Sequence, residues 1–158
     1  FDDKDYEFII NVQGDEPLLI ANEIKMIGLA HQSSDFDIFT GVKKRKSTDP
    51  EFKNSNVVKC IYSQVTNQCL YFSRESIPFN RDGIDHDWFQ HIGIYSYKVK
   101  ALLDFVELNE SAFERGEKLE QLRALENGMT LGAELTEINL IGVDTPEDIH
   151  KIEGALRD

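Results

Sequence analysis

Two aspartates stand where an apolar run gives way to a proline-containing turn. Asp15 follows the run FIINV within FIINVQGDEP at 8–17, and Asp144 lies within GVDTPED at 142–148. Ligands of open α/β sheets bind at the carboxyl ends of strands, and carboxylate oxygens there suit a hard cation such as Mg²⁺. Alternatively, Asp15 caps the following turn or helix and Asp144 is a solvated loop residue. The residues alone leave both alternatives open.

A histidine opens a third run of interest, HIGIYSY at 91–97. Because side chains alternate along a strand, His91, Gly93 and Tyr95 share one face and two isoleucines occupy the other. This pattern indicates either a strand with one core face and one ligand-binding face, or a half-buried strand whose histidine is hydrogen-bonded internally.

The period of a predicted helix over residues 116–127 places three leucines on one stripe, with Glu117, Glu120 and Gln121 on the opposite side. That polar face is either solvated or lines a polar pocket. Arg74 lies where a predicted strand enters a long loop. A guanidinium at that position can bind a carboxylate bidentately, or form an ordinary surface salt bridge.

The overall charge narrows the class of partner. The chain has 158 residues with 17 basic and 29 acidic side chains, a net charge of −12, which argues against nucleic acid as a partner. An acidic protein that binds an anionic nucleotide needs a cation between them, usually Mg²⁺.

We find no secretory signal and no apolar run of the ~18 residues that a membrane span needs, and therefore expect a cytoplasmic protein. Cys60 and Cys69 are predicted to be reduced, buried thiols.

The hydrophobic pattern predicts a single α/β domain over 1–158, with a mostly parallel sheet and an antiparallel excursion. Asn22 is the predicted N-cap of the first helix. The expected elements are strands over 7–13, 36–42, 91–97 and 131–140, a hairpin of Val57–Tyr62 and Cys69–Ser73, a long loop over 74–90, and helices over 22–31, 99–107, 116–127 and 146–156.

Six stretches taken together and in order resemble one family, the 3-deoxy-manno-octulosonate cytidylyltransferases, also called CMP-Kdo synthetases. The resemblance extends from about residue 8 to the end of the chain. It is carried by NVQGDEPL at 11–18, NVVK at 56–59, LYFSR at 70–74 with IP at 77–78, HIGIYSY at 91–97, EKLEQLR at 117–123 and GVDTPED at 142–148.

The resemblance implies a three-layer, Rossmann-like fold of the nucleotide-diphospho-sugar transferase type, with a mixed sheet that has an antiparallel excursion. It implies transfer of CMP from CTP to the acidic sugar 3-deoxy-D-manno-octulosonate (Kdo), with release of pyrophosphate, for lipopolysaccharide biosynthesis. It further implies Mg²⁺ as cofactor and a homodimer that associates through residues 43–90. On this template Asp15 and Asp144 are the catalytic and metal-binding carboxylates. The sugar-binding positions are Gln13, Arg74, His91, Tyr95, Glu120 and Gln121.

The sequence departs from the family pattern in one important respect. The glycine- and arginine-rich loop that grips CTP in the family has no counterpart here, so we interpret the chain as the carboxyl-terminal two-thirds of a nucleotidyltransferase domain. Alone it should bind CTP poorly and turn over little. Two alternatives stay open: a cytidylyltransferase for another acidic sugar, such as an amino-substituted relative of Kdo, and a non-catalytic binding or dimerisation module.

Overall fold

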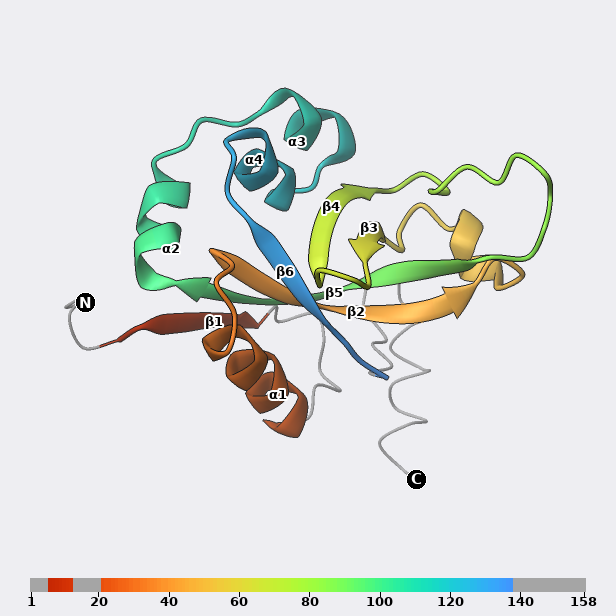
Figure 1. Cartoon of the computed structure of the whole chain (residues 1–158). Helices are drawn as coiled ribbons and strands as arrows, with labels where there is room; N and C mark the ends of the chain where they lie inside the picture. Colours follow the sequence, from red (N-terminus) through yellow and green to blue (C-terminus); the bar gives the residue numbers. More distant parts are fainter. Residues whose placement is uncertain (1–5, 13–20, 138–158) are drawn as a thin grey trace, which may run out of the picture.

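The computed structural model describes residues 6–12 and 21–137, and within these ranges six strands form one mixed sheet (Figure 1). The strand order across the sheet is β1-β5-β2-β6-β4-β3. The order of elements along the chain agrees with the sequence-based expectation up to residue 137, except that two short helices replace the one expected over 116–127; the helix expected over 146–156 lies outside the described residues. The strands are β1 (Phe8–Val12), β2 (Ile38–Lys46), β3 (Lys59–Ser63), β4 (Gln68–Ser73), β5 (Asp87–Lys98) and β6 (Leu131–Leu135).

The expectation of a mostly parallel sheet is wrong for the described residues. Among them only β2 and β6 pair in parallel, and all other strand pairs are antiparallel. The β3–β4 hairpin, which was correctly predicted, returns the chain so that β5 runs against both β1 and β2. Antiparallel neighbours need no helical crossover, which explains why no α-helix lies between β2 and β5 in the chain.

Strand β1 lies at the edge of this sheet and pairs only with β5 among the described strands. The sequence pattern predicted a strand buried on both faces. In the structure, Ile10 and Val12 are exposed. Strand β1 therefore presents an apolar edge of the kind that favours association with another strand.

Helices cover both faces of the sheet and give three layers (Figure 1). On one face lies α1 (Ala21–Gln32); on the other lie α2 (Val99–Val106), α3 (Ala112–Glu117) and α4 (Gln121–Glu126). Helix α1 begins at Ala21, so Asn22 lies inside its first turn. The prediction that Asn22 is the N-cap is therefore wrong.

Each face of the sheet has its own hydrophobic core. Ile27 of α1 packs with Phe39, Ile92 and Ile94 on one face. The larger core on the other face contains Phe105 of α2 and Leu122 of α4, together with tyrosines of β5 and both cysteines. Cys60 and Cys69 are free and buried, as predicted. The alternation predicted along β5 is therefore correct, because its isoleucines and its tyrosines enter different cores.

Strands β2 and β5 continue together beyond the helices and form a projecting arm with the short 3₁₀ helix η2 (Pro50–Lys53) (Figure 1). The sequence assigned 43–56 to a connection and 74–90 to a loop. Both strands are longer than expected because residues 43–46 pair with 87–90. Trp88 is fully buried in the arm and donates its indole N–H to the Lys46 carbonyl (2.9 Å), which supplies the apolar packing that a charged strand lacks.

We predict that Gly132→Ala lowers the free energy of unfolding by about 1–3 kcal/mol, as overpacking does. Gly132 lies on β6, where an added Cβ would stand 2.2 Å from Cδ2 of Phe36. Gly116→Ala is the matched control: Gly116 lies in α3 with nothing near its Cβ position, and alanine there should add about 0.5–1 kcal/mol. Chemical denaturation of both variants tests this; equal stability of the two would contradict the described packing of Phe36 on β6.

Candidate sugar-binding face

Five of the predicted site residues fall within the described ranges, and the structure brings them to the sheet face covered by α3 and α4. His91 and Tyr95 are neighbours on β5, with ring centroids 5.3 Å apart. Arg74 follows the end of β4, and Glu120 with Gln121 stands at the start of α4. Gln13, Asp15 and Asp144 lie outside the described residues, so their predicted roles stay predictions.

The predicted single helix over 116–127 is wrong, because the chain breaks into α3 and α4 at Lys118. Lys118 is in the left-handed conformation (φ 55°) and its N–H bonds to the Glu114 carbonyl. The break turns Glu117 toward β4, where its carboxylate accepts from Ser73 Oγ (2.6 Å) and from the Arg74 backbone N–H (2.9 Å). Glu117 therefore joins the helices to the sheet and does not share one polar helix face with Glu120 and Gln121.

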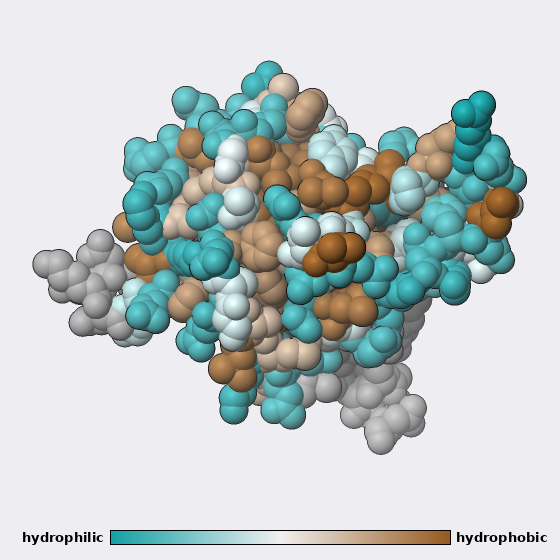
Figure 2. Space-filling model, viewed as in Figure 1, coloured by the Kyte–Doolittle hydropathy of each residue, from teal (hydrophilic) through white to brown (hydrophobic). Residues whose placement is uncertain are grey.

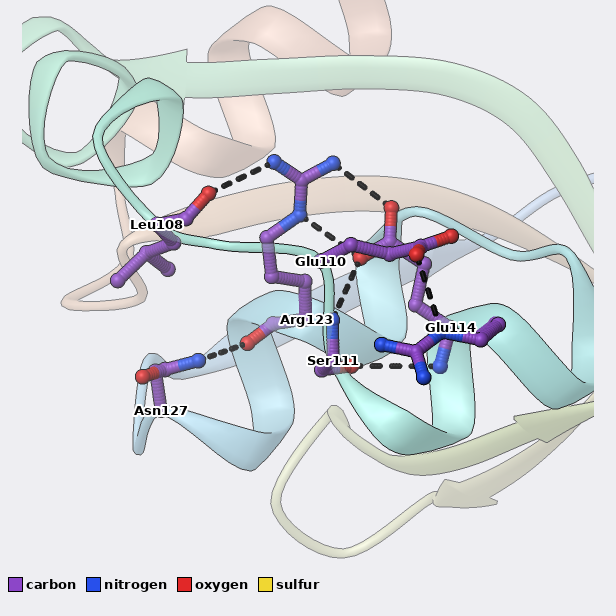
Figure 3. Close-up of polar contacts among 7 residues, drawn as sticks. Leu108, Glu110, Ser111, Glu114, Arg123 and Asn127 are labelled. Carbon is purple, nitrogen blue, oxygen red and sulfur yellow. Dashed lines mark hydrogen bonds and ion pairs between the residues drawn. The ribbon is translucent and has the colours of Figure 1, made fainter.

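A partly buried ion pair fixes the angle between the two short helices (Figure 3). Arg123 of α4 donates from Nε and Nη2 to the two carboxylate oxygens of Glu114 in α3 (2.9 and 2.7 Å) and from Nη1 to the Leu108 carbonyl (3.1 Å). Glu114 also completes a capping box with Ser111. Every polar atom of this cluster is well paired, so α4 is held rigidly and presents Glu120 and Gln121 to β5.

The hydrogen bonds around His91 fix its tautomer. Thr40 Oγ1 has one proton, and it lies 2.8 and 2.7 Å from the carbonyl oxygens of Ile92 and Ile94, which can only accept. The contact of 3.1 Å between Thr40 Oγ1 and His91 Nε2 must then be a donation from an Nε2–H group. In the neutral imidazole this leaves Nδ1 as an acceptor, and a sugar hydroxyl is a donor that fits it.

Burial keeps His91 neutral and its neighbours uncharged. Burial lowers the pKa of His91 to about 3, so the ring has no charge near pH 7. Burial, and then the nearby Tyr97 and other groups including Glu120, raise the pKa of Tyr95 well above its usual value. Burial and the Glu120 carboxylate raise the pKa of Tyr97 to about 12. The exposed Glu120 therefore acts on the tyrosines of β5, which places its charge beside this face of the sheet.

Gln121 has the feature expected of a group that awaits a ligand. It is buried, yet within the described residues its Nε2 has no hydrogen-bond partner. An unpaired buried amide costs about 1–3 kcal/mol, a cost that a bound hydroxyl or carboxylate oxygen would remove. The sequence identified Gln121 only through the family resemblance, because helical periodicity placed it on a polar, exposed side.

Arg74 is anchored and retains donors for a ligand. Its Nε–H donates to the Glu117 carbonyl (2.8 Å) and Nη1 to the Ser55 carbonyl (3.0 Å). Two of the five N–H donors of the guanidinium are thus bonded to backbone within the described residues, which leaves three for a carboxylate.

Sequence reasoning missed two residues that shape this face. Thr40 sets the His91 tautomer, and a threonine within a strand gives no sign of this role. Glu117 holds Arg74, but it was interpreted as part of a continuous helix, and only a break in the leucine spacing could have indicated otherwise.

A pocket of about 580 Å³ exists elsewhere, beside α1 and the β3–β4 turn. It includes none of the predicted site residues, and its lining hydroxyls mostly bond to nearby backbone or side-chain oxygens, as Ser34 does to the His31 carbonyl.

Over residues 6–12 and 21–137 no three His, Cys, Asp or Glu side chains gather into a metal site. Asp15 and Asp144, the predicted metal carboxylates, lie outside these ranges. No helix in the same ranges is long and apolar enough to cross a membrane.

Comparison with known proteins first identifies the class of protein to which this chain belongs. A family model described as "Cytidylyltransferase" matches residues 1–134, and the chain belongs to this family. A solved inositol-1-phosphate CTP transferase from T. maritima shares the fold at a TM-score of 0.59, with 17% identity over 97% of this chain and 57% of its own.

Closer relatives give the particular branch, the CMP-Kdo synthetase family. The 3-deoxy-manno-octulosonate cytidylyltransferases of Syntrophotalea carbinolica and Solibacter usitatus are 42% and 41% identical over 97% and 92% of the chain. A solved CMP:2-keto-3-deoxy-manno-octonic acid synthetase, complexed with CTP, superposes at a TM-score of 0.87 with 27% identity, over 96% of this chain and 62% of its own. The chain spans about 60% of the length of such relatives: 64% and 58% of the two sequences above.

Because the folded state disfavours protonated His91, we predict that stability falls in acid. The pKa of His91 drops from 6.5 to about 3 on folding, and burial also lowers the pKa of His31. The unfolding free energy should then decline as the pH falls below about 6.5, by up to about 1.4 kcal/mol per pH unit for His91, and His31 should act in the same direction. His91→Gln should flatten this slope between about pH 6 and 5. An unchanged slope in denaturation experiments would contradict the buried, neutral assignment.

Proposed function

We propose that this chain carries the acidic-sugar and metal-binding part of an enzyme that transfers CMP from CTP to Kdo. The anomeric hydroxyl oxygen of the sugar attacks the α-phosphorus of CTP, a new P–O bond forms, and the bond to pyrophosphate breaks. The single observation that supports this most is the face on which Arg74, His91, Tyr95 and Gln121 gather, each with unused or ligand-compatible polar atoms.

The chemistry of this face suits a polyhydroxylated carboxylic acid. The free N–H donors of Arg74 match a carboxylate in charge and geometry. Neutral His91 Nδ1 accepts from hydroxyls, Gln121 Nε2 donates to oxygens, and Glu120 accepts from hydroxyls at the edge. The CTP-bound relative supports CTP as the co-substrate.

Asp15 and Asp144 are the residues that we propose for Mg²⁺, on the resemblance alone. When bound there, Mg²⁺ would orient the α-phosphate of CTP and neutralise charge on the triphosphate. An acidic protein of net charge −12 needs such a counter-charge next to CTP. We further propose a cytoplasmic location, where CTP is available.

The direct test uses the natural protein that contains this sequence. With CTP, Kdo and Mg²⁺ it should release pyrophosphate, and removal of the metal with a chelator should stop release. Asp15→Ala should lower the rate by about a hundredfold or more, as expected when a metal carboxylate is lost. Asp35→Ala, a change beside the α1 pocket, is the control with an unchanged rate.

If pyrophosphate is released with an amino-substituted relative of Kdo but not with Kdo itself, that sugar would replace Kdo as the proposed substrate. Absence of release with any acidic sugar would contradict the enzyme and favour the non-catalytic module.

We also propose that the protein pairs as a homodimer through the arm within residues 43–90. Phe79 and Ile84, in the loop at the end of the arm, are 86% and 67% exposed. Figure 2 shows apolar side chains at the far end of the arm, surrounded by hydrophilic ones. Exposed apolar side chains of this kind mark association surfaces.

The double variant Phe79→Ser with Ile84→Ser should shift the protein from dimer to monomer in sedimentation velocity, because burial of both side chains contributes about 3–6 kcal/mol. Leu103→Ser, at an exposed position on α2, is the control and should remain dimeric. A dimer that survives the double variant would contradict an interface at the arm.

A further inference from the structure

Lys59, the charged residue of the NVVK stretch, is fully buried. It begins β3 between β4 and β5, paired with Ser73 and Gln90, and its exposed fraction is 0%. Within the described residues no carboxylate forms an ion pair with it. A lysine is almost never fully buried without a partner, so its ammonium must serve a purpose there.

All three protons of the ammonium are used on backbone carbonyls. Nζ donates to the carbonyl oxygens of Asn54 (2.7 Å), Val57 (2.8 Å) and Arg74 (2.8 Å). Three donors meet three acceptors, which satisfies the group completely. Burial lowers the pKa of Lys59, and the Glu75 and Glu51 carboxylates oppose this.

The three carbonyls belong to two of the segments that place the Arg74 guanidinium; the third is Glu117, whose carbonyl accepts from Arg74 Nε. One is the carbonyl of Arg74 itself, at the exit of β4. The others bracket Ser55, whose carbonyl accepts from Arg74 Nη1 at 3.0 Å. The turn over 54–58 is also fixed to β5, because the His91 N–H donates to the Val58 carbonyl (2.9 Å). Lys59 thus holds the backbone of Arg74 and the turn on which its side chain rests.

We propose that Lys59 is a positioning residue for the acidic-sugar site, which acts by fixing the Arg74 guanidinium in the orientation that receives the sugar carboxylate. This inference rests on the proposed function for the identity of the ligand, but not for the contact between Lys59 and Arg74. Lys59 itself touches no substrate, since its donors are saturated by backbone.

The ligand-free test measures hydrogen exchange of the Arg74 Nε–H group by NMR in the natural protein. Lys59→Met removes all three donors and should accelerate this exchange about tenfold or more, as local opening becomes easier. Lys53→Met, an exposed lysine of η2, should leave it unchanged. If Lys59→Met does not fold, Lys59→Gln, whose amide can still donate to two of the carbonyls, takes its place. Unchanged exchange in a folded Lys59 variant would overturn the inference.

A ligand-binding cycle separates positioning from a merely structural role. Lys59→Met should weaken Kdo binding about tenfold, while the KM for CTP stays within about twofold. In an Arg74→Met background the same change should have little further effect, because the two residues act as one unit. Additive effects would overturn the inference. If the unaltered protein does not bind Kdo, the proposed function fails, and the exchange experiment still decides the role of Lys59.

Discussion

The alternation of side chains along β5 is the constraint on which the rest of the structure depends. This strand of twelve residues pairs with β1, β2 and β3, so it connects both halves of the sheet. A strand has two faces, and a shift of one residue would exchange them. Ile92 and Ile94 must enter the core beneath α1, and this requirement alone turns His91 and Tyr95 to the face under α3 and α4.

The proposed sugar-binding face is then completed by polar groups that hold one another. The Glu114–Arg123 pair sets α4 against α3, Glu117 joins α3 to the end of β4, and the Thr40 hydroxyl sets the tautomer of His91. These contacts are partly buried, and shielding from water makes a paired polar group more rigid and an unpaired one more costly. The Nε2 of Gln121 stands out because it is unpaired among otherwise satisfied neighbours.

Much of the fold follows from the sequence, and the exceptions have physical causes. The hairpin, the two faces of β5 and the order of elements were predicted from local patterns. The direction of strand pairing was not, since an apolar run such as FIINV reads alike in parallel and antiparallel sheets. The ends of β2 and β5 depend on pairing between residues over forty positions apart, as in Lys46 and Asp87. Leucine spacing continues smoothly through 116–127, so the left-handed turn at Lys118, which tertiary contacts impose, left no local signal.

For the site, single residues said little about function. Only the six stretches, taken together and in order, indicated the family. His91 and Tyr95 were placed on one face by alternation, whereas Glu120 and Gln121 were proposed as ligand-binding residues only through the resemblance. Lys59 was quoted as part of NVVK, but its burial against three carbonyls depends on a turn and a strand exit that periodicity does not reveal.

The central claim is that an acidic sugar binds at the face formed by Arg74, His91, Tyr95 and Gln121. The most direct measurement is a titration of the natural protein with Kdo, followed through the side-chain amide signal of Gln121 and the ring nitrogens of His91 by NMR. The account predicts that both signals shift together and saturate, with His91 remaining neutral. Binding that shifts signals around the α1 pocket, and leaves Gln121 and His91 unmoved, would contradict it.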